Sequence, residues 1–116
     1  MAKLTLRIEF DQDRAIGPGK ARLLELIREH RSIAAAGRAM GMSYRRAWLL
    51  VDELNRCFDE PVVLAQHGGR AGGGAELTGF GCALLGHYRA IEREARRATR
   101  GRLTALRRKL RRAQPP

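Results

Sequence analysis

One segment, SIAAAGRAMGMSYRRAWLLVDELN between Ser32 and Asn55, constrains the fold of this chain more than any other. Ser32 is a good N-cap for a first short helix. A run of three alanines followed by Gly37 keeps that helix slim, so another helix can approach it closely. Gly41 supplies the left-handed backbone conformation that ends the first helix, and Ser43 then caps a second one. The pattern predicts a helix-turn-helix.

The second of these helices has an apolar face and a basic end. Apolar residues recur at positions i, i+4, i+7 and i+11, the spacing of a buried stripe. They are Ala47, Val51, Leu54 and Phe58. Trp48 flanks this stripe, and we assign it to the core. In a helix-turn-helix, the N-terminal end of the second helix contacts the edges of DNA bases. The residues expected there are Ser43, Tyr44, Arg45, Arg46 and Leu49.

The chemistry of these side chains suits DNA. Arginine bonds the O6 and N7 atoms of guanine in a bidentate pair, which suits Arg45 and Arg46 to base recognition. The hydroxyls of Ser43 and Tyr44 are better suited to phosphate, and phosphate contacts fix the register of a protein on the duplex. The alternative is a surface helix with two solvated arginines. The preceding helix and turn favour contact with DNA.

The residues before this segment predict a strand and a helix. In residues 3–10, KLTLRIEF, apolar and polar side chains alternate, which is typical of a strand with one buried face. Residues 11–13 end that strand, and residues 16–19 read as a loop. Pro18 suits the first turn of a helix, and an apolar face predicts that this helix runs to about Arg31.

A glycine-rich hairpin is predicted after the helix-turn-helix. Pro61 breaks the second helix, residues 62–64 and 75–77 are strand-like, and HGGRAGGG lies between them. We interpret this hairpin as a wing, with Arg70 at its tip drawn to a narrow minor groove and His67 beside phosphate. A nucleotide-binding loop is excluded because no Gly-Lys-Ser/Thr follows the glycines. A merely flexible hairpin is the remaining alternative.

A long helix follows the hairpin, with Thr78 as its N-cap. Its apolar residues follow spacings of three and four, and the stripe is too extended for so small a domain to cover. Pairing with the same helix of a second chain would bury it. The residues assigned to this dimerisation face are Phe80, Leu84, Tyr88, Ile91 and Ala95. The alternative is that this helix packs against the chain's own N-terminal strand and helix. The two arrangements are compatible if the proximal part of the helix packs internally and only the distal part contacts the second chain.

Charge is distributed unevenly along the chain. The formal net charge is +11, and residues 61–116 hold 12 basic side chains against 3 acidic ones, whereas residues 1–60 hold 11 against 9. Arginine far outnumbers lysine, and its guanidinium fork suits phosphate and guanine, although a GC-rich genome also produces such a surface. The arginines at positions 89, 93, 96, 97 and 100 are expected to be mainly solvated. The segment RRKLRR from Arg107 to Arg112 is interpreted as a phosphate-binding arm, with an anionic membrane surface as the alternative.

Little in the sequence suits catalysis, so an enzyme is not expected. The three histidines lie in different predicted elements with no carboxylate or thiol at ligand spacing, so no catalytic residue, metal or cofactor is expected. Cys57 and Cys82 fit neither a metal site nor a disulfide framework, and we interpret both as buried, reduced thiols of a cytoplasmic protein. Glu53 is expected to form a surface ion pair. The sequence has no apolar run long enough to cross a membrane and no recognisable leader.

The expected fold is mainly α-helical with a small β component, and the length suits about one domain. Residues 1–78 are expected to form a winged helix-turn-helix with its N-terminal strand. Residues 79–112 would form the long C-terminal dimerisation helix with a basic tail. Residues 113–116 are expected to be a disordered tail.

Two motifs carry a family resemblance. One is S-Y-R-R-A-W-x-x-V-x-E-L-N from Ser43 to Asn55, and the other is G-G-R-A-G-G-G-A-x-L-T-x-x-G from Gly68 to Gly81. Together they resemble the N-terminal DNA-binding domain of ModE, the molybdate-responsive transcription regulator, which is related to the LysR-type winged helix. The likeness covers roughly residues 18–95. It implies a bacterial transcription regulator that binds double-stranded DNA sequence-specifically as a homodimer.

The resemblance also sets an expectation about effectors. ModE carries two molybdate-binding modules after this domain, and the arginine-rich tail here is not such a module, so the family's oxyanion-binding residues have no counterparts in this sequence. Any effector, molybdate included, would act through a separate partner. Two other classes stay open: a non-specific nucleic-acid architectural protein driven by the basic tail, and a protein–protein adaptor that has lost DNA binding. The basic character of Arg45, Arg46 and Arg70 argues against the adaptor.

Overall fold

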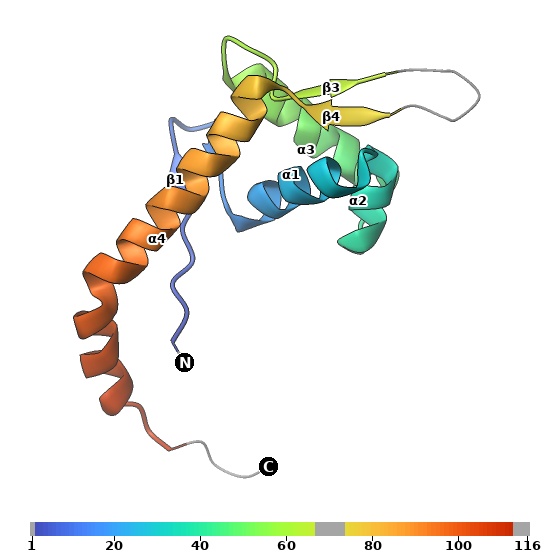
Figure 1. Ribbon diagram of the computed structural model, residues 1–116. Coiled ribbons are helices and arrows are strands. Elements are labelled where there is room, and N and C mark those ends of the chain that lie inside the picture. The colour runs from blue at the N-terminus through green and yellow to red at the C-terminus, as the bar shows by residue number, and fades with distance from the viewer. Residues whose placement is uncertain (1, 67–73, 113–116) are drawn as a thin grey trace.

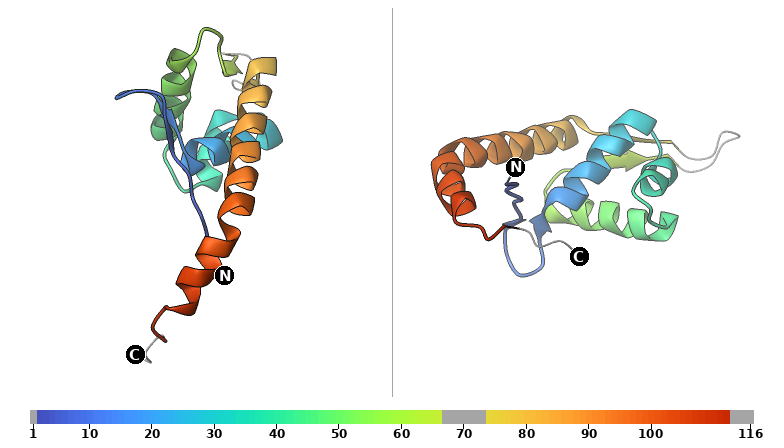
Figure 2. Two further views of the ribbon diagram at one scale, coloured as in Figure 1. Left: turned by 90° about the vertical axis from the view of Figure 1, so that its left-hand side faces the viewer. Right: turned by 90° about the horizontal axis from the view of Figure 1, so that it is seen from below.

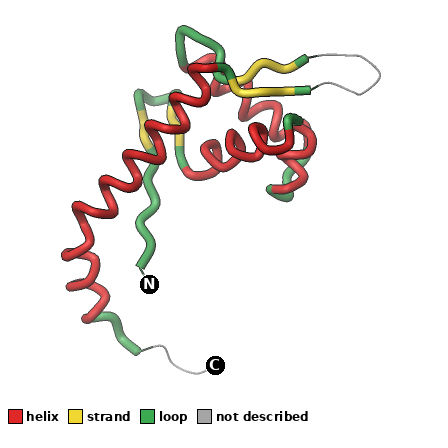
Figure 3. The backbone as a smooth tube through the Cα atoms, in the orientation of Figure 1, coloured by secondary structure: helices red, strands yellow, loops and turns green. Residues whose placement is uncertain are grey.

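The first helix lies at the centre of the fold, and a computed structural model describes residues 2–66 and 74–112. In chain order its elements are β1 (Ile8–Glu9), β2 (Ala15–Ile16), α1 (Pro18–His30), α2 (Ile33–Ala39), α3 (Tyr44–Cys57), β3 (Val63–Ala65), β4 (Ala75–Leu77) and α4 (Gly79–Arg108) (Figure 1). β1 pairs antiparallel with β2, and β3 with β4. The predicted mainly helical architecture with a small β component is confirmed (Figure 3).

The core forms around α1. Its fully buried apolar residues are Ala21, Leu23, Leu24 and Ile27. The other helices and the segment before β3 each add buried side chains to the same cluster, among them Ala36, Ala47, Leu54, Val62, Leu85 and Tyr88. Burying one leucine or isoleucine contributes about 1.5–3 kcal/mol. One continuous core therefore holds α2 and α3, the β3–β4 hairpin and the start of α4 together.

The N-terminal segment forms less sheet than predicted. The strand expected over residues 3–10 is confined to β1, where Ile8 pairs with Ile16 of a strand that was expected to be loop. The residues before β1 run beside α4 (Figure 2). There the hydroxyl of Tyr88 donates a hydrogen bond to the carbonyl oxygen of Leu6 at 2.6 Å. The expected alternation of partly buried and exposed side chains is present from Leu4 to Glu9 but fails at Phe10, which is 50% exposed. A tyrosine on a helix replaces the strand partner of the residues before β1.

α4 is a continuous helix of 30 residues, as predicted, and passes through Gly101 without a break. Its first half packs on the core through Gly81, Leu84, Leu85, Tyr88 and Glu92. Its second half extends beyond the core (Figures 1 and 2), and the molecule measures 57 × 37 × 26 Å. Of the arginines expected to be solvated, those at positions 93, 96, 97 and 100 are exposed.

The two cysteines are free thiols in different environments. Cys57 is partly buried and Cys82 is exposed. The expectation that both are buried is wrong for Cys82, because it lies outside the buried face of α4.

Candidate nucleic-acid interface

A tight turn joins α2 to α3, and both helices have the predicted caps. The hydroxyl of Ser32 accepts a hydrogen bond from the N–H of Ala35 at 3.0 Å. The hydroxyl of Ser43 accepts one from the N–H of Arg46 at 3.1 Å. Between them Gly41 has a φ of 71°, the left-handed conformation that glycine adopts without strain. These local signals set the start of α3.

α2 and α3 approach each other closely at Gly37. A Cβ at this position would lie 3.0 Å from the Cβ of Ala47, which is fully buried. The N–H of Met42 also donates to the carbonyl oxygen of Gly37 at 2.9 Å. Small residues at this crossing fix how α3 lies against α2, and therefore where the N-terminal end of α3 projects.

The N-terminal end of α3 faces solvent. The exposed fraction is 55% for Tyr44 and 46% for Leu49, and Ser43, Arg45 and Arg46 are exposed as well. Among residues 2–66 and 74–112, no carboxylate forms an ion pair with either arginine. Their guanidinium groups are therefore available to an anion or a base, and the N-terminal end of the helix dipole adds positive potential.

The acidic side chains of α3 lie further along the helix and are paired. Asp52 lies 3.1 Å from the Arg56 guanidinium. Glu53 lies 3.2 Å from the ammonium group of Lys20 on α1, which confirms the ion pair expected for it. Because a cation accompanies each carboxylate, the negative charge does not oppose the basic start of the helix.

Asn55 ties the β3–β4 hairpin to the end of α3. Its side-chain oxygen accepts hydrogen bonds from the N–H groups of Val62 at 2.7 Å and Val63 at 3.0 Å. Its amide nitrogen donates to the carbonyl oxygen of Val63 at 3.0 Å. Sequence reasoning included Asn55 in a motif but assigned it no role. These three hydrogen bonds fix the position of the hairpin relative to α3.

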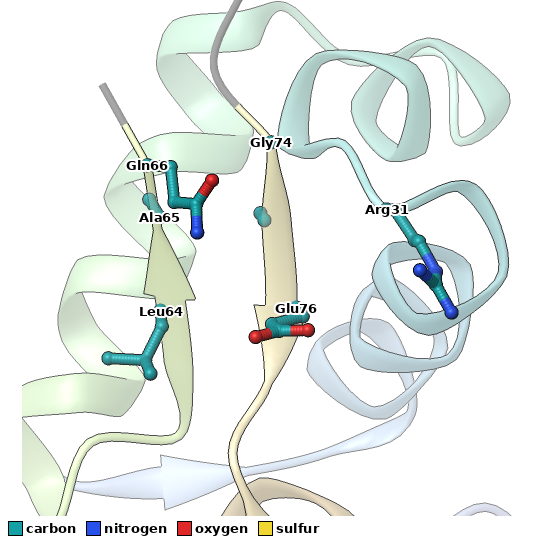
Figure 4. A pocket seen from close by; sticks show the side chains of 7 residues that line it. Arg31, Leu64, Ala65, Gln66, Gly74 and Glu76 are labelled. Atoms are coloured by element: carbon teal, nitrogen blue, oxygen red, sulfur yellow. The ribbon is translucent and has the colours of Figure 1, made fainter. Parts of the chain in front are cut away.

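The other strand of the hairpin is anchored to the end of α1. The N–H of Ala75 donates to the carbonyl oxygen of Arg31 at 3.0 Å. A pocket of about 420 Å³ lies at this place. Figure 4 shows Leu64 and Glu76 on its neighbouring strands and Arg31 on the far side of β4. The carboxylate of Glu76 does not suit a phosphate, so we place no DNA contact in this pocket.

The fold brings together the two elements expected to contact DNA. The open end of β3–β4 and the start of α3 lie at one end of the molecule, whereas the second half of α4 lies at the other (Figures 1 and 2). The two wing residues named from the sequence, His67 and Arg70, lie outside the described residues.

A half-buried ion-pair network joins α4 to α1. Two nitrogens of Arg89 lie 2.7 and 3.1 Å from the carboxylate of Glu25, and a third lies 2.7 Å from Glu92, which is only 4% exposed. The hydrogen bonds that Arg89 donates to the Glu25 carboxylate lower the pKa of Glu25 and raise the pKa of Arg89. The expectation that Arg89 is solvated is therefore wrong. Glu25, the main partner of Arg89, lies 64 residues away in the chain, so no local sequence pattern predicts this ion pair.

The predicted dimerisation residues divide into two groups. Leu84 and Tyr88 are buried in the chain's own core, at 8% and 1% exposure, and Phe80 packs against that core. The first part of α4 is therefore internal. Further along, Ile91 is 40% exposed and Ala95 is partly buried. Contact with a second chain stays a prediction. It is now predicted only for the distal part of α4.

Two other kinds of site are absent from the described part of the chain. No group of three or more His, Cys, Asp or Glu side chains there is placed to hold a metal ion. No helix there is both long and apolar enough to cross a bilayer. The start of α3, with Arg45 and Arg46 exposed, and the second half of α4 are two basic, solvent-facing surfaces of the described part of the chain.

Bacterial proteins connected with molybdenum are similar in sequence. The chain is 44% identical over 77 residues to the molybdenum-pterin-binding protein MopA of Rhodobacter capsulatus, covering 66% of this chain and 29% of MopA. It is 37% identical over 89 residues to the molybdenum transport protein ModE of Azotobacter vinelandii, covering 77% and 33%. It is 32% identical over 87 residues to the DNA-binding transcriptional dual regulator ModE of Escherichia coli K12, covering 75% and 33%.

These relatives support the ModE family that the two motifs indicated. Their names denote regulators, a transport protein or molybdenum-pterin-binding proteins, and none denotes an enzyme. The chain spans about a third of the length of these relatives. No protein-family model matches the sequence.

Proposed function

We propose that this chain is a sequence-specific, DNA-binding transcription regulator of the ModE type. In this proposal α2 and α3 form a helix-turn-helix and β3–β4 forms its wing. The observation that carries the proposal is the exposed start of α3, where Arg45 and Arg46 have no carboxylate partner among the described residues. The hairpin held by Asn55 extends the same end of the molecule.

Each proposed contact follows from side-chain chemistry. Arg45 and Arg46 bond guanine edges in the major groove. Ser43 and Tyr44 contact phosphate and set the register. In the wing, His67 and Arg70 are proposed to reach the backbone and the minor groove.

A homodimer would place two such surfaces on one DNA site. The part of α4 around Ile91, which is 40% exposed, and Ala95, which is partly buried, offers apolar surface for pairing. Two recognition helices bind half-sites that lie about one DNA turn, 34–36 Å, or a multiple apart. The proposed operator is therefore related to itself by a two-fold axis. Sedimentation of the purified protein at micromolar concentration tests the dimer directly.

The names of the relatives indicate which genes this regulator would control. Because their names connect them with molybdenum, we propose that the regulated genes handle this element, in the cytoplasm of a bacterium. Any effector is proposed to act through a separate partner.

Selection from random duplex DNA tests the function. Rounds of binding to purified protein should enrich one motif, and competition should then show a preference of about 10³-fold or more over random duplex. Affinity should also fall with salt, with a log–log slope near −7 if about eight phosphates are contacted per dimer. Binding without enrichment of any motif contradicts sequence-specific regulation.

A second candidate is a non-specific architectural protein. The exposed arginines along the second half of α4 favour it, because phosphate contacts alone supply non-specific affinity. Equal affinity for the enriched duplex and for random DNA would support this candidate. Absence of DNA binding at low salt would instead support a protein–protein adaptor.

A further inference from the structure

A shallow apolar hollow lies within the proposed recognition surface. It has a volume of about 330 Å³ and is lined by Tyr44, Arg45, Trp48 and Leu49. These positions are i, i+1, i+4 and i+5, so they share one side of α3. Trp48 is partly buried and packs against the core, whereas Tyr44 and Leu49 are about half exposed. The hollow thus has a fixed aromatic wall and an accessible leucine.

An aromatic wall beside an exposed leucine is not needed for phosphate binding. Phosphate contacts need cations and hydrogen-bond donors, and Arg45 supplies a cation at the edge of the hollow. Leu49 adds neither a charge nor a donor, yet it lies on the outer face of α3, one turn beyond Arg45. In the major groove the C5-methyl of thymine is the apolar group of the DNA base edges. A leucine beside an aromatic wall is chemically matched to it.

We infer that Leu49, with Trp48 and Tyr44 beside it, binds the C5-methyl group of a thymine in each half-site. This inference rests on the proposed function and adds the base that the apolar part of the surface selects. Arg45 and Leu49 are four residues apart, which is about 6 Å along a helix. Base pairs are stacked about 3.4 Å apart. The thymine therefore lies within about two base steps of the guanine bound by Arg45.

Deoxyuridine provides the test, because it differs from thymidine only by the missing methyl group. A duplex enriched from a random pool is resynthesised with each thymine replaced in turn by deoxyuridine, and affinity is measured by fluorescence anisotropy. Loss of one buried methyl corresponds to about a fourfold weakening, and to about 15-fold when both half-sites are changed. One thymine per half-site should show this loss, and the other thymines should not.

Two variants assign the effect to the hollow. Leu49→Ala should bind the thymine and deoxyuridine duplexes equally, because the group that contacts the methyl is gone. Leu106→Ala removes an exposed leucine on α4, outside the proposed recognition surface, and should keep the fourfold difference. Circular dichroism melts check that both variants fold, as the exposure of both leucines leads us to expect.

Trp48 supplies an independent readout, because it is the chain's one tryptophan. Its emission should change when the thymine duplex binds. If the hollow takes an apolar side chain of a partner protein instead, DNA will leave this emission unaltered, and the inference is overturned.

The possible failures are distinguishable. An enriched site that tolerates deoxyuridine at every position overturns the inference and leaves the proposed function standing. The same holds if Leu49→Ala retains the fourfold difference. If no site is enriched, the proposed function fails and the inference fails with it.

Discussion

At the scale of single residues, Gly81 shows how closely two parts of the chain approach each other. It lies in the first turn of α4, and a Cβ there would lie 2.1 Å from the carbonyl oxygen of Val62. The N–H of Thr78 donates to that same oxygen at 3.0 Å, so the oxygen is held in place. Neither backbone can move without breaking the junction between the hairpin and α4.

Gly81→Ala should therefore destabilise the fold by at least about 2 kcal/mol, the cost of forcing atoms into a packed site. Gly79→Ala is the matched control, because a Cβ at Gly79 meets nothing within 4 Å. Its stability should be unchanged or raised by up to about 1 kcal/mol through better helix propensity. Urea unfolding of the three proteins measures the difference. Similar stability for both variants would contradict the close contact.

Glu25 gives the stability a predictable dependence on pH. Hydrogen bonds from Arg89 hold its pKa below the usual value of 4.5. In such a case the folded state gains stability from the ionised carboxylate above the unfolded pKa, and loses it as the pH falls through the lower folded pKa. The gain is thus present at pH 6 and is lost progressively below about pH 4.5.

Glu25→Gln should remove this contribution, which we expect to be about 1 kcal/mol at pH 6 because the pair is only half buried. The free energies of unfolding of the variant and the wild type should converge as the pH falls toward 3. Urea unfolding over this range measures both. Glu29→Gln, on an exposed residue of the same helix, is the control. A Glu25→Gln deficit that stays constant with pH would show that the ion pair is not its source.

At the scale of elements, the sequence predicts what local chemistry decides. Ser32, Ser43 and Thr78 each cap the helix that follows, because a hydroxyl at this position bonds an N–H three residues later. Gly41 ends α2 for an equally local reason. The bounds of α2, α3 and α4 therefore follow closely from the sequence, and so does the solvent-facing start of α3.

What the sequence does not predict depends on how elements meet. The segment before β1 reads as a strand by alternation, yet its neighbour is the hydroxyl of Tyr88 rather than another strand. Arg89 reads as solvated, yet it pairs with Glu25 of α1 and with Glu92, which is buried. Asn55 reads as an ordinary helix residue, although it holds the hairpin. The partners of Tyr88 and Arg89 lie 82 and 64 residues away in the chain, and those of Asn55 lie seven and eight residues on, beyond the end of α3.

Asn55 links two elements of the proposed DNA surface, so its replacement should affect both stability and binding. Asn55→Ala removes three hydrogen bonds and leaves the N–H of the buried Val62 without an acceptor. We expect a loss of about 2–4 kcal/mol. Asn55→Asp keeps the oxygen that accepts from Val62 and Val63 but places a carboxylate oxygen beside the carbonyl oxygen of Val63, so it should recover only part of the stability.

DNA affinity provides the second measurement for this prediction. Under conditions where both variants are folded, Asn55→Ala should weaken binding more than Asn55→Asp, because the hairpin is no longer fixed relative to α3. Equal affinity for the enriched duplex would show that the position of the hairpin does not matter to binding.

At the scale of the whole molecule, two kinds of positive surface lie at opposite ends. The start of α3 is a compact surface with Arg45 and Arg46 beside an apolar hollow. The second half of α4 carries arginines around an exposed helix. With the N-terminal segment it borders a groove of about 710 Å³, lined in part by Lys3, Arg96 and Arg107. The first surface offers geometry suited to a base pair, whereas the second offers charge spread over a long helix.

Specificity and general affinity should therefore be separable by mutation. Arg45→Ala or Arg46→Ala should lower the preference for the enriched site by about 10-fold or more, because the bidentate pair with guanine can no longer form. Removal of residues 103–116 should instead weaken binding to every duplex alike, and should make the salt slope shallower by about 0.9 for each phosphate that the shortened protein no longer neutralises. Competition between the enriched and a random duplex over a range of salt concentrations measures both quantities. If the truncation lowers the preference as much as the arginine variants do, the tail takes part in sequence recognition and the two ends of the molecule do not have separate roles.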